Sequence, residues 1–361
     1  MTERKKSIKL KIVEVSGSHY EMGFQYGKAC PEIPDMLVMT YGLFGGRDKI
    51  QGFLDATIPV YLSHTERYAP EIVEEMRGMA DGSGLAFEDI LFLNITYEIS
   101  VESVMGGCTS FAAAGEVTAN GKQLAGQNID HIEHWMDYLI LLKMKPADGP
   151  EVMAVTANGC LTLTGINSAG ISVNMNLLRN NESMEPKGGV PTHVILRKIL
   201  MSETLGEAIY AIASAEGRSP KNYLITGVNE GIIDVETMMT DVDIQYPENG
   251  ILTHANHFKA ERFKSSDLAP VLVPDSYIRS QKMFHLMDEH RGNISVDLMK
   301  QFFQDHSNYP NAICRHRNPK GLLPISRIMK TLISIISCPE EQRVYIAAGN
   351  PCETEYVEYR M

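Results

Sequence analysis

Cys108 follows Gly106-Gly107, and this step combines residue types that could cleave the chain's own backbone. Glycine lets the backbone bend freely, so the thiol could attack the carbonyl carbon that precedes it. Such an N→S acyl shift, followed by hydrolysis, would leave Cys108 with a free α-amine. An α-amine has an ordinary pKa of about 7.7–8.0 and could act as general base for its own thiol. The alternative is a buried structural cysteine, because free cysteine is among the most buried residue types.

Two histidine pairs are further candidates for chemistry. His131 and His134 stand three residues apart, and His254 and His257 flank Asn256. They could serve an uncleaved Cys-His hydrolase, or a metal site if the fold brought both pairs together, since zinc needs three or four ligands. The six cysteines lie far apart without a Cys-x-x-Cys pair, so spacing predicts neither a zinc site nor a disulfide framework. We therefore expect no bound metal.

Five short motifs follow one another along most of the chain. They are Gly107-Cys108-Thr109-Ser110-Phe111, Gly126-Gln127-Asn128-Ile129-Asp130, His254-Ala255-Asn256-His257-Phe258, Ile313-Cys314-Arg315-His316 and Gly349-Asn350-Pro351-Cys352-Glu353. In this order they resemble the acyl-coenzyme A:6-aminopenicillanic acid acyltransferase (isopenicillin N acyltransferase) family of N-terminal-nucleophile (Ntn) hydrolases.

The resemblance implies an α+β fold, a four-layer αββα sandwich with a helical N-terminal segment. It also implies autocatalytic cleavage between Gly107 and Cys108, which would divide one folded body into a mostly helical chain of residues 1–107 and a catalytic chain of residues 108–361. Cys108 would be the nucleophile in both self-cleavage and catalysis. Asp130 would hold the α-amine of the nucleophile, since a nearby carboxylate orients an ammonium group and tunes its pKa; its alternative role is to cap a turn.

Three more residues receive roles from the resemblance. Asn256 would donate its side-chain N–H to the developing oxyanion, with an ordinary turn asparagine as the alternative. Arg315 would lie near Cys108 and Asp130 and favour the charged forms of both, unless it is a surface arginine. Ser110 would be a small hydroxyl residue next to the cleavage site, or else a strand residue with ordinary hydrogen bonds.

These residues predict a self-processing amidase or acyltransferase that attacks a small amide or thioester. A thioester acyl-enzyme on Cys108 would be resolved by water or by an amine. No cofactor is implied, although acyl-coenzyme A could be a co-substrate. His131 and His134 stand where aromatic pocket residues are expected, which indicates a polar acyl group. The alternatives are an uncleaved binding or scaffold protein with an inert Cys108, and the conventional Cys-His hydrolase.

The elements that must position these residues can be read from periodicity. After a first strand near residues 8–15, residues 17–105 read mainly as helix, including one helix over 61–80 that ends at the turn 81–84. From Cys108 onward, short apolar runs alternate with turn signals, as in an antiparallel sheet. Strands are predicted near 110–114, 123–128, 138–144, 152–156, 161–166, 171–175, 223–226, 232–237, 332–336 and 343–347; helices are predicted near 87, 191–202, 205–216, 277–289 and 296–304.

Composition limits the partners. The formal net charge is −12, and an acidic field repels phosphate backbones, so a nucleic-acid partner is not expected. No segment approaches the roughly 20 apolar residues of a membrane helix, and the N-terminus lacks a signal-peptide core. We expect a cytoplasmic enzyme with a small-molecule substrate, whose two chains derive from one precursor; assembly into a homo-oligomer is left open.

Overall fold

Two β-sheets form the centre of the protein in the computed structural model, which describes residues 5–99, 107–181, 188–321 and 324–361. The larger sheet has the strand order β1-β4-β5-β6-β7-β8-β9-β10, and the smaller one β11-β2-β3-β12-β13-β14. The strands are β1 (Lys11–Gly17), β2 (Thr109–Ala113), β3 (Leu124–Ile132), β4 (Leu139–Pro146), β5 (Val152–Ala157), β6 (Thr164–Asn167), β7 (Ile171–Leu177), β8 (Lys221–Gly227), β9 (Gly231–Thr237), β10 (Val242–Gln245), β11 (Ile251–His254), β12 (Met329–Cys338), β13 (Arg343–Ala348) and β14 (Val357–Arg360). Neighbouring strands are antiparallel except β1 and β4, which are parallel.

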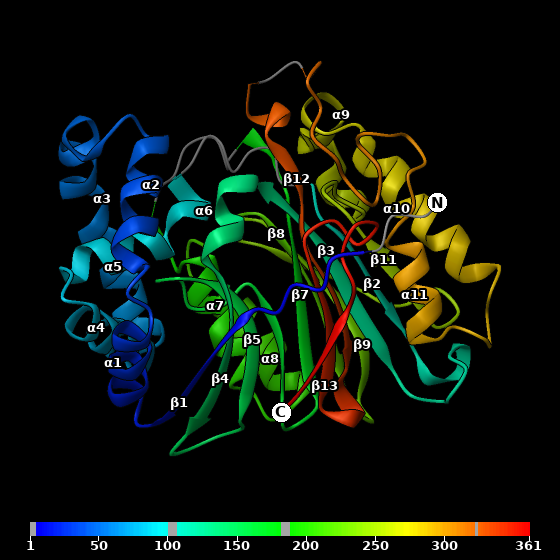
Figure 1. The fold of residues 1–361 in the computed structure, drawn as a ribbon, viewed down its shortest axis with the longest axis horizontal. Coiled ribbons are helices and arrows are strands. Elements are labelled where there is room, and N and C mark those ends of the chain that lie inside the picture. Colours follow the sequence, from blue (N-terminus) through cyan, green and yellow to red (C-terminus); the bar gives the residue numbers. More distant parts are fainter. Residues whose placement is uncertain (1–4, 100–106, 182–187, 322–323) are drawn as a thin grey trace.

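Helices cover the outer faces of both sheets, which gives four layers (Figure 1). The helices are α1 (His19–Ala29), α2 (Ile33–Leu43), α3 (Arg47–Tyr68), α4 (Pro70–Ser83), α5 (Phe87–Asn94), α6 (Thr96–Ile99), α7 (Thr192–Leu200), α8 (Leu205–Ala213), α9 (Ala269–Leu272), α10 (Asp275–Asp288) and α11 (Val296–Phe302). Helices α7 and α8 pack on the larger sheet, and α10 and α11 pack on the smaller one. The αββα sandwich predicted from the resemblance is confirmed.

The N-terminal helices follow local sequence signals. Helix α1 begins with a capping box, in which Ser18 and Glu21 bond each other's backbone N–H groups. The prediction of one helix over 61–80 is wrong, because Ala69 takes an extended conformation before Pro70, which starts α4. Helix α4 then runs to Ser83 and ends at Gly84, whose φ of 71° is left-handed.

Most predicted strands and later helices are present, with ends shifted by a few residues. Strands β10, β11 and β14 were not predicted, since each has only four residues and carries little periodicity. Strand β11 pairs with β2, so that His254 lies opposite Ser110. This pairing brings the segment around Asn256 toward the start of β2.

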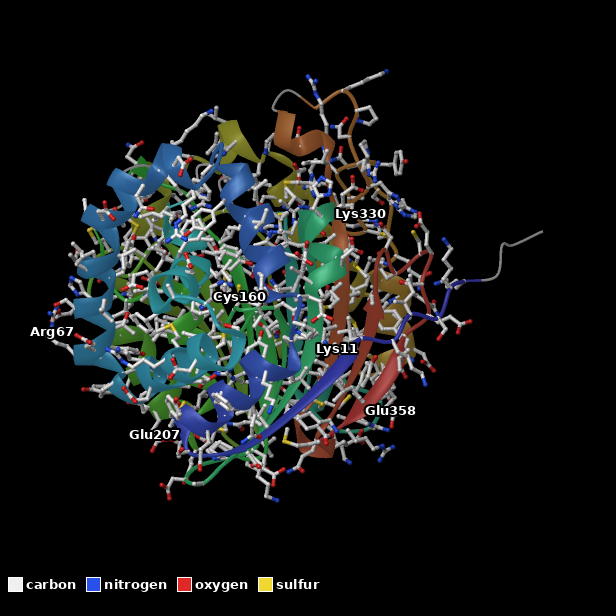
Figure 2. All side chains as sticks on the ribbon, turned by 60° about the vertical axis from the view of Figure 1, so that its left-hand side comes forward. Lys11, Arg67, Cys160, Glu207, Lys330 and Glu358 are labelled. Atoms are coloured by element: carbon white, nitrogen blue, oxygen red, sulfur yellow. The ribbon has the colours of Figure 1, made fainter. Side chains whose placement is uncertain are left out.

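The core is continuous across the layers. One buried hydrophobic cluster contains side chains from α1, β4, β7 and β12, together with Cys108. Figure 2 shows Cys160 in this interior, whereas Arg67 and Glu207 lie at the outer edge. No helix in the described parts of the chain is long and apolar enough to cross a membrane.

Candidate active site

Cys108 lies directly before β2, a strand that is flanked by β11 and β3 within the smaller sheet. Its side chain is buried with 7% exposure and belongs to the apolar cluster between the sheets. Burial, followed by the negative charge of Asp130, raises the pKa of the Cys108 thiol to about 12. The thiol is therefore protonated at neutral pH, and a base would be needed to form the thiolate.

Gly107 is pressed against an ion pair formed by Arg315 and Asp130. Arg315 Nε donates to Asp130 Oδ2 at 3.1 Å, and both side chains are nearly inaccessible to solvent. A Cβ atom on Gly107 would lie 2.5 Å from Arg315 Nε and 2.9 Å from Asp130 Oδ2. Such distances are too short for carbon, so the residue before Cys108 must be glycine for the ion pair to keep this position.

The Asp130 carboxylate is held by strand pairing as well as by charge. Thr331 lies opposite Asp130 on β12, and its hydroxyl donates to Asp130 Oδ1 at 2.7 Å. Burial raises the pKa of Asp130 to about 6, although the charges of Arg315 and Arg279 and the Thr331 bond act in the opposite direction. This carboxyl group therefore changes its charge near neutral pH, which suits a proton acceptor.

A second buried arginine, Arg279, connects Cys108 to Asn256. Its Nη1 donates to the carbonyl oxygen of Cys108 at 2.6 Å and to Thr109 Oγ1 at 2.9 Å. Its Nη2 donates to Asn256 Oδ1 at 2.9 Å. Asp275, one turn earlier on α10, accepts from Arg279 Nε at 2.8 Å and also from Arg315 Nη2. The Asp275 carboxylate thus ties both arginines together, and three ion pairs form a chain from Asp130 through Arg315 and Asp275 to Arg279.

Sequence reasoning missed Asp275 and Arg279. Their spacing of four residues is a signal, but Asp275 lies two residues before the helix predicted near 277–289; in the structure both belong to α10 and share one face. Nothing in that spacing alone distinguishes a buried pair from an exposed one, however.

Asn256 lies in the loop after β11 and is fixed from several sides. Its backbone N–H donates to Ser276 Oγ at 2.6 Å, and its Nδ2 donates to the carbonyl oxygen of Leu177 at 3.0 Å. With Oδ1 held by Arg279, the amide cannot flip without losing both side-chain bonds. The arrangement leaves the NH₂ group as the end of the side chain that can serve as a donor, as an oxyanion hole requires.

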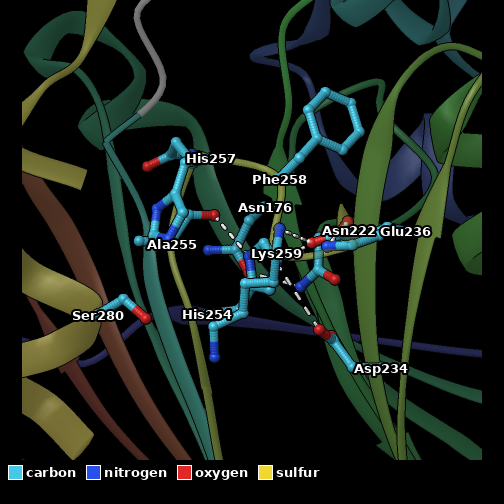
Figure 3. Close-up of polar contacts among 12 residues, drawn as sticks. Asn176, Asn222, Asp234, Glu236, His254, Ala255, His257, Phe258, Lys259 and Ser280 are labelled. Carbon is cyan, nitrogen blue, oxygen red and sulfur yellow. Dashed lines mark hydrogen bonds and ion pairs between the residues drawn. The ribbon is translucent and has the colours of Figure 1, made fainter. Parts of the chain in front are cut away.

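Glu236 on β9 anchors this loop to the larger sheet (Figure 3). Its carboxylate accepts from His254 Nε2 at 2.7 Å and from the backbone N–H groups of Lys259 and Ala260 at 2.6 and 3.0 Å. Interactions with Glu236 and Asp234 raise the pKa of His254, although burial opposes them, and the same histidine lowers the pKa of Glu236 against its burial. The loop that carries Asn256 is therefore clamped by a buried charged group.

Ser110 points in another direction. Its hydroxyl donates to Asn176 Oδ1 at 2.6 Å, an atom that also accepts from Asn222. These two asparagines belong to β7 and β8, so Ser110 joins a polar network between the sheets. The structure thus brings Cys108, Asp130, Arg315 and Asn256 together through the two arginines, whereas Ser110 contacts a different set of residues.

The histidine pairs have separate surroundings. His131 packs on Trp135 with ring centroids 4.2 Å apart, and burial lowers its pKa to about 4. His134 is exposed. His257 stacks on Tyr277 at 4.1 Å. Among the described residues, neither group able to hold a metal ion combines the two pairs.

A narrow apolar cavity lies beside the Asp130 strand. Its lining consists of aromatic and aliphatic side chains and His131: Tyr97, Ile129, His131, Trp135, Leu139, Val155, Leu163, Leu332 and Ile333. The apolar members belong to the same large buried cluster as Cys108. Burial lowers the pKa of His131 to about 4 and raises that of Tyr97, so both titratable rings are neutral near pH 7. His134 is exposed and does not line this cavity, whereas Trp135 supplies aromatic surface to it; a polar acyl group stays a prediction.

Comparison with known proteins agrees with this geometry. The family model "Acyl-coenzyme A:6-aminopenicillanic acid acyl-transferase" matches residues 117–353, which include Asp130, Asn256 and Arg315 and begin after Cys108. The "Acyl-coenzyme A:6-aminopenicillanic-acid-acyltransferase 40 kDa form" of Emericella nidulans is 29% identical over 309 residues, 84% of each chain.

Among solved structures, the Caenorhabditis elegans N-acylethanolamine-hydrolyzing acid amidase ortholog has a TM-score of 0.47 at 16% identity, over 64% of this chain and 93% of its own. A mutant conjugated bile acid hydrolase from Clostridium perfringens has a TM-score of 0.46 at 15% identity, over 70% and 97% of the two chains. Because the family model covers about two thirds of the sequence, the chain belongs to the acyl-coenzyme A:6-aminopenicillanic acid acyltransferase family of Ntn hydrolases and is an amidohydrolase or acyltransferase.

Proposed function

We propose that this enzyme activates itself by cutting the bond between Gly107 and Cys108, and that the new N-terminal Cys108 then cleaves a small amide or thioester. The observation that carries the proposal is the contact of Gly107 with the Asp130–Arg315 pair, which puts a carboxyl group with a pKa of about 6 beside the bond to be cut. The products would be chains of residues 1–107 and 108–361.

Self-cleavage would proceed through a thioester. Asp130 takes the proton of the Cys108 thiol, and the sulfur attacks the carbonyl carbon of Gly107. The C–N bond then breaks as Asp130 returns that proton to the leaving nitrogen, which becomes the α-amine of Cys108. Water then hydrolyses the thioester and leaves a carboxylate on Gly107. The freed amine remains near Asp130, which favours its ammonium form, and can exchange protons with its own thiol in later turnovers.

Catalysis on an external substrate would use the same groups. The thiolate attacks the substrate carbonyl, Asn256 Nδ2 donates to the oxyanion, and collapse expels the amine or thiol leaving group. Removing one such donor typically slows the reaction about 10²–10³-fold. We favour an apolar acyl group, because the cavity beside the Asp130 strand is lined mostly by hydrocarbon side chains and includes Tyr97, whose pKa is raised by burial and then by the nearby Cys108. Water is the favoured acceptor, with an amine or coenzyme A as the second choice.

The test is to trap the acyl-enzyme. The purified protein is treated with p-nitrophenyl esters of short and long fatty acids and of a polar dicarboxylic acid, then quenched in acid and mapped by peptide mass. We expect acyl mass on Cys108, greater for apolar acyl groups, and none on Cys160, a buried thiol that serves as internal control. Acylation elsewhere, or none at Cys108, would overturn the proposal.

A further inference from the structure

Four potential metal ligands converge on one side of Arg315. They are His306 Nε2, Cys314 Sγ, His316 Nε2 and Cys352 Sγ, and all four atoms lie within 4.8 Å of one another. Spacing along the chain had argued against such a site, because Cys314 and Cys352 are 38 residues apart and the loop and hairpin between them must fold before they meet. From this convergence we infer that the protein holds a structural zinc ion in a Cys₂His₂ site.

The distances between the ligand atoms agree with a tetrahedral zinc ion. Zn–S bonds of about 2.3 Å and Zn–N bonds of about 2.0–2.1 Å give edges of about 3.8 Å for S–S, 3.6 Å for S–N and 3.3 Å for N–N. The sulfur atoms of Cys314 and Cys352 are 3.5 Å apart, and His316 Nε2 lies 3.7 and 3.4 Å from them. The Nε2 atoms of His306 and His316 are 3.1 Å apart. Two sulfur and two nitrogen atoms in this geometry favour zinc among the common metals.

Residues around the four ligands supply the contacts that metal sites commonly have. Asn350 Nδ2 lies 3.5 Å from Cys314 Sγ, where it can donate to a thiolate. Glu353 Oε1 lies 3.8 Å from His316 Nδ1, the ring nitrogen that faces away from the other ligands, which is beyond hydrogen-bond distance. A small movement of this carboxylate would give the carboxylate–histidine bond that fixes the metal-binding tautomer.

The second candidate metal group, Asp234, Glu236 and His254, offers only three ligands and already contains a buried ion pair. Its histidine already satisfies Glu236 at 2.7 Å, and all three side chains are fully buried in the loop anchor described above. The Cys₂His₂ group differs from this one, because its four ligand atoms face one another without an ion pair among them. Its two thiols are only weak hydrogen-bond donors.

Zinc at this site would position Arg315. That residue stands between two ligands, Cys314 and His316, so the ion would fix the backbone on both sides of it. Asn350, next to the ligand-bearing turn, also donates from Nδ2 to the carbonyl oxygen of Arg315 at 2.7 Å. Binding would release two thiol protons to solvent and leave a neutral centre of two thiolates, two imidazoles and Zn²⁺. The effect on self-cleavage rests on the proposed function, whereas the metal site itself does not.

Metal content tests the site independently of cleavage. The full-length protein, purified without a metal-affinity step, should contain one zinc per chain by atomic emission, and replacing it with Co²⁺ should produce the visible bands of a tetrahedral thiolate complex. His306→Ala and Cys352→Ser should lose the bound zinc and the visible bands of the Co²⁺ form. His134→Ala and Cys338→Ala should keep the zinc and the bands. Glu353→Gln should weaken zinc binding about ten-fold, and Glu355→Gln should not.

Three results would overturn the assignment. One is a substoichiometric zinc content that these variants do not change. Another is a mass two hydrogen atoms lower that is restored by reductant, which would show a Cys314–Cys352 disulfide. The third is a metal other than zinc in the purified protein. If zinc is present but the chain stays uncut, the zinc site is supported and the proposed self-cleavage is wrong. If Cys352→Ser loses zinc and also cleaves more slowly than Cys338→Ala, the zinc site and its effect on self-cleavage are both supported.

Discussion

Arg279 and Asn256 are joined by a hydrogen bond of 2.9 Å from Nη2 to Oδ1, while Nη1 of the same arginine reaches the carbonyl oxygen of Cys108. A single rigid guanidinium therefore sets the distance between the proposed nucleophile and the proposed oxyanion donor. Lysine cannot replace this fork, since its ammonium group is one point of contact instead of several in a plane.

Arg279→Lys should therefore slow both self-cleavage and turnover about 10²-fold, because a misplacement of about 1 Å has that effect on a positioned reaction. The positive charge next to Asp275 is kept, so the chain should still fold, which circular dichroism and thermal melting can check. Arg262→Lys, at an exposed arginine with two aspartate partners, is the matched control. Equal cleavage rates in the two variants would show that Arg279 only stabilises the fold.

Gly107→Ala should block self-cleavage by displacing the Asp130–Arg315 pair. The added methyl group would lie 2.5 Å from Arg315 Nε, so the ion pair has to move away from the bond. Gly52→Ala adds the same group in α3, where nothing lies within 4 Å of the new atom, and should cleave at the normal rate. Normal cleavage of the Gly107 variant would mean that the contact is not needed for the chemistry.

The rate of self-cleavage should fall as the pH drops below about 6. Asp130 must be ionised to accept the thiol proton, and burial raises its pKa to about 6. The rate therefore rises with pH, but the contribution of Asp130 to the unfolding free energy falls. A carboxyl group whose pKa is raised in the folded state destabilises the fold increasingly as the pH rises from about 4 to 6.

Thr331→Val should move this acid limb upward by about one pH unit. The variant loses the hydroxyl that donates to Asp130 Oδ1 at 2.7 Å, and a hydrogen bond to a charged group contributes about 1.5–3 kcal/mol. Thr118→Val, far from the site, provides the comparison. A rate that is constant between pH 5 and 7 in the wild type would argue against Asp130 as the base.

Glu236→Gln should lower the unfolding free energy by about 3 kcal/mol, because it leaves the buried His254 without its closest countercharge. In the wild type, the raised pKa of His254 gives stability below about pH 6.5 that is lost as the pH rises through the folded-state value. The lowered pKa of Glu236 gives stability above about pH 4.5 that is lost as the pH falls through its folded-state value. Chemical denaturation from pH 4 to 9 should give an unfolding free energy with a maximum between about pH 4.5 and 6.5 in the wild type. The unfolding free energy of Glu236→Gln should change less with pH. Identical pH profiles for the two proteins would contradict the role of Glu236 in holding the loop.

Apolar alternation and turn residues are local signals, and they predicted most of the strands; the four-layer sandwich was implied by the resemblance of the five motifs. The same motifs predicted a site at Cys108, Asp130, Asn256 and Arg315, and the structure places these four residues close together. Arg279 and Asp275 could not be ranked, because their importance depends on α10 packing across the start of β2. The Cys₂His₂ cluster was missed for a similar reason: the β12–β13 hairpin returns Cys352 to Cys314, and no spacing rule encodes that return.

The central claim is that the chain cuts itself at one bond, and intact mass measures this most directly. Wild-type protein incubated at pH 7.5 should yield two fragments, residues 1–107 and 108–361, with an N-terminal cysteine on the second. Cys108→Ala should remain one chain of 40.2 kDa under the same conditions. A wild-type protein that stays whole after prolonged incubation, or one that is cut at another bond, would contradict the account.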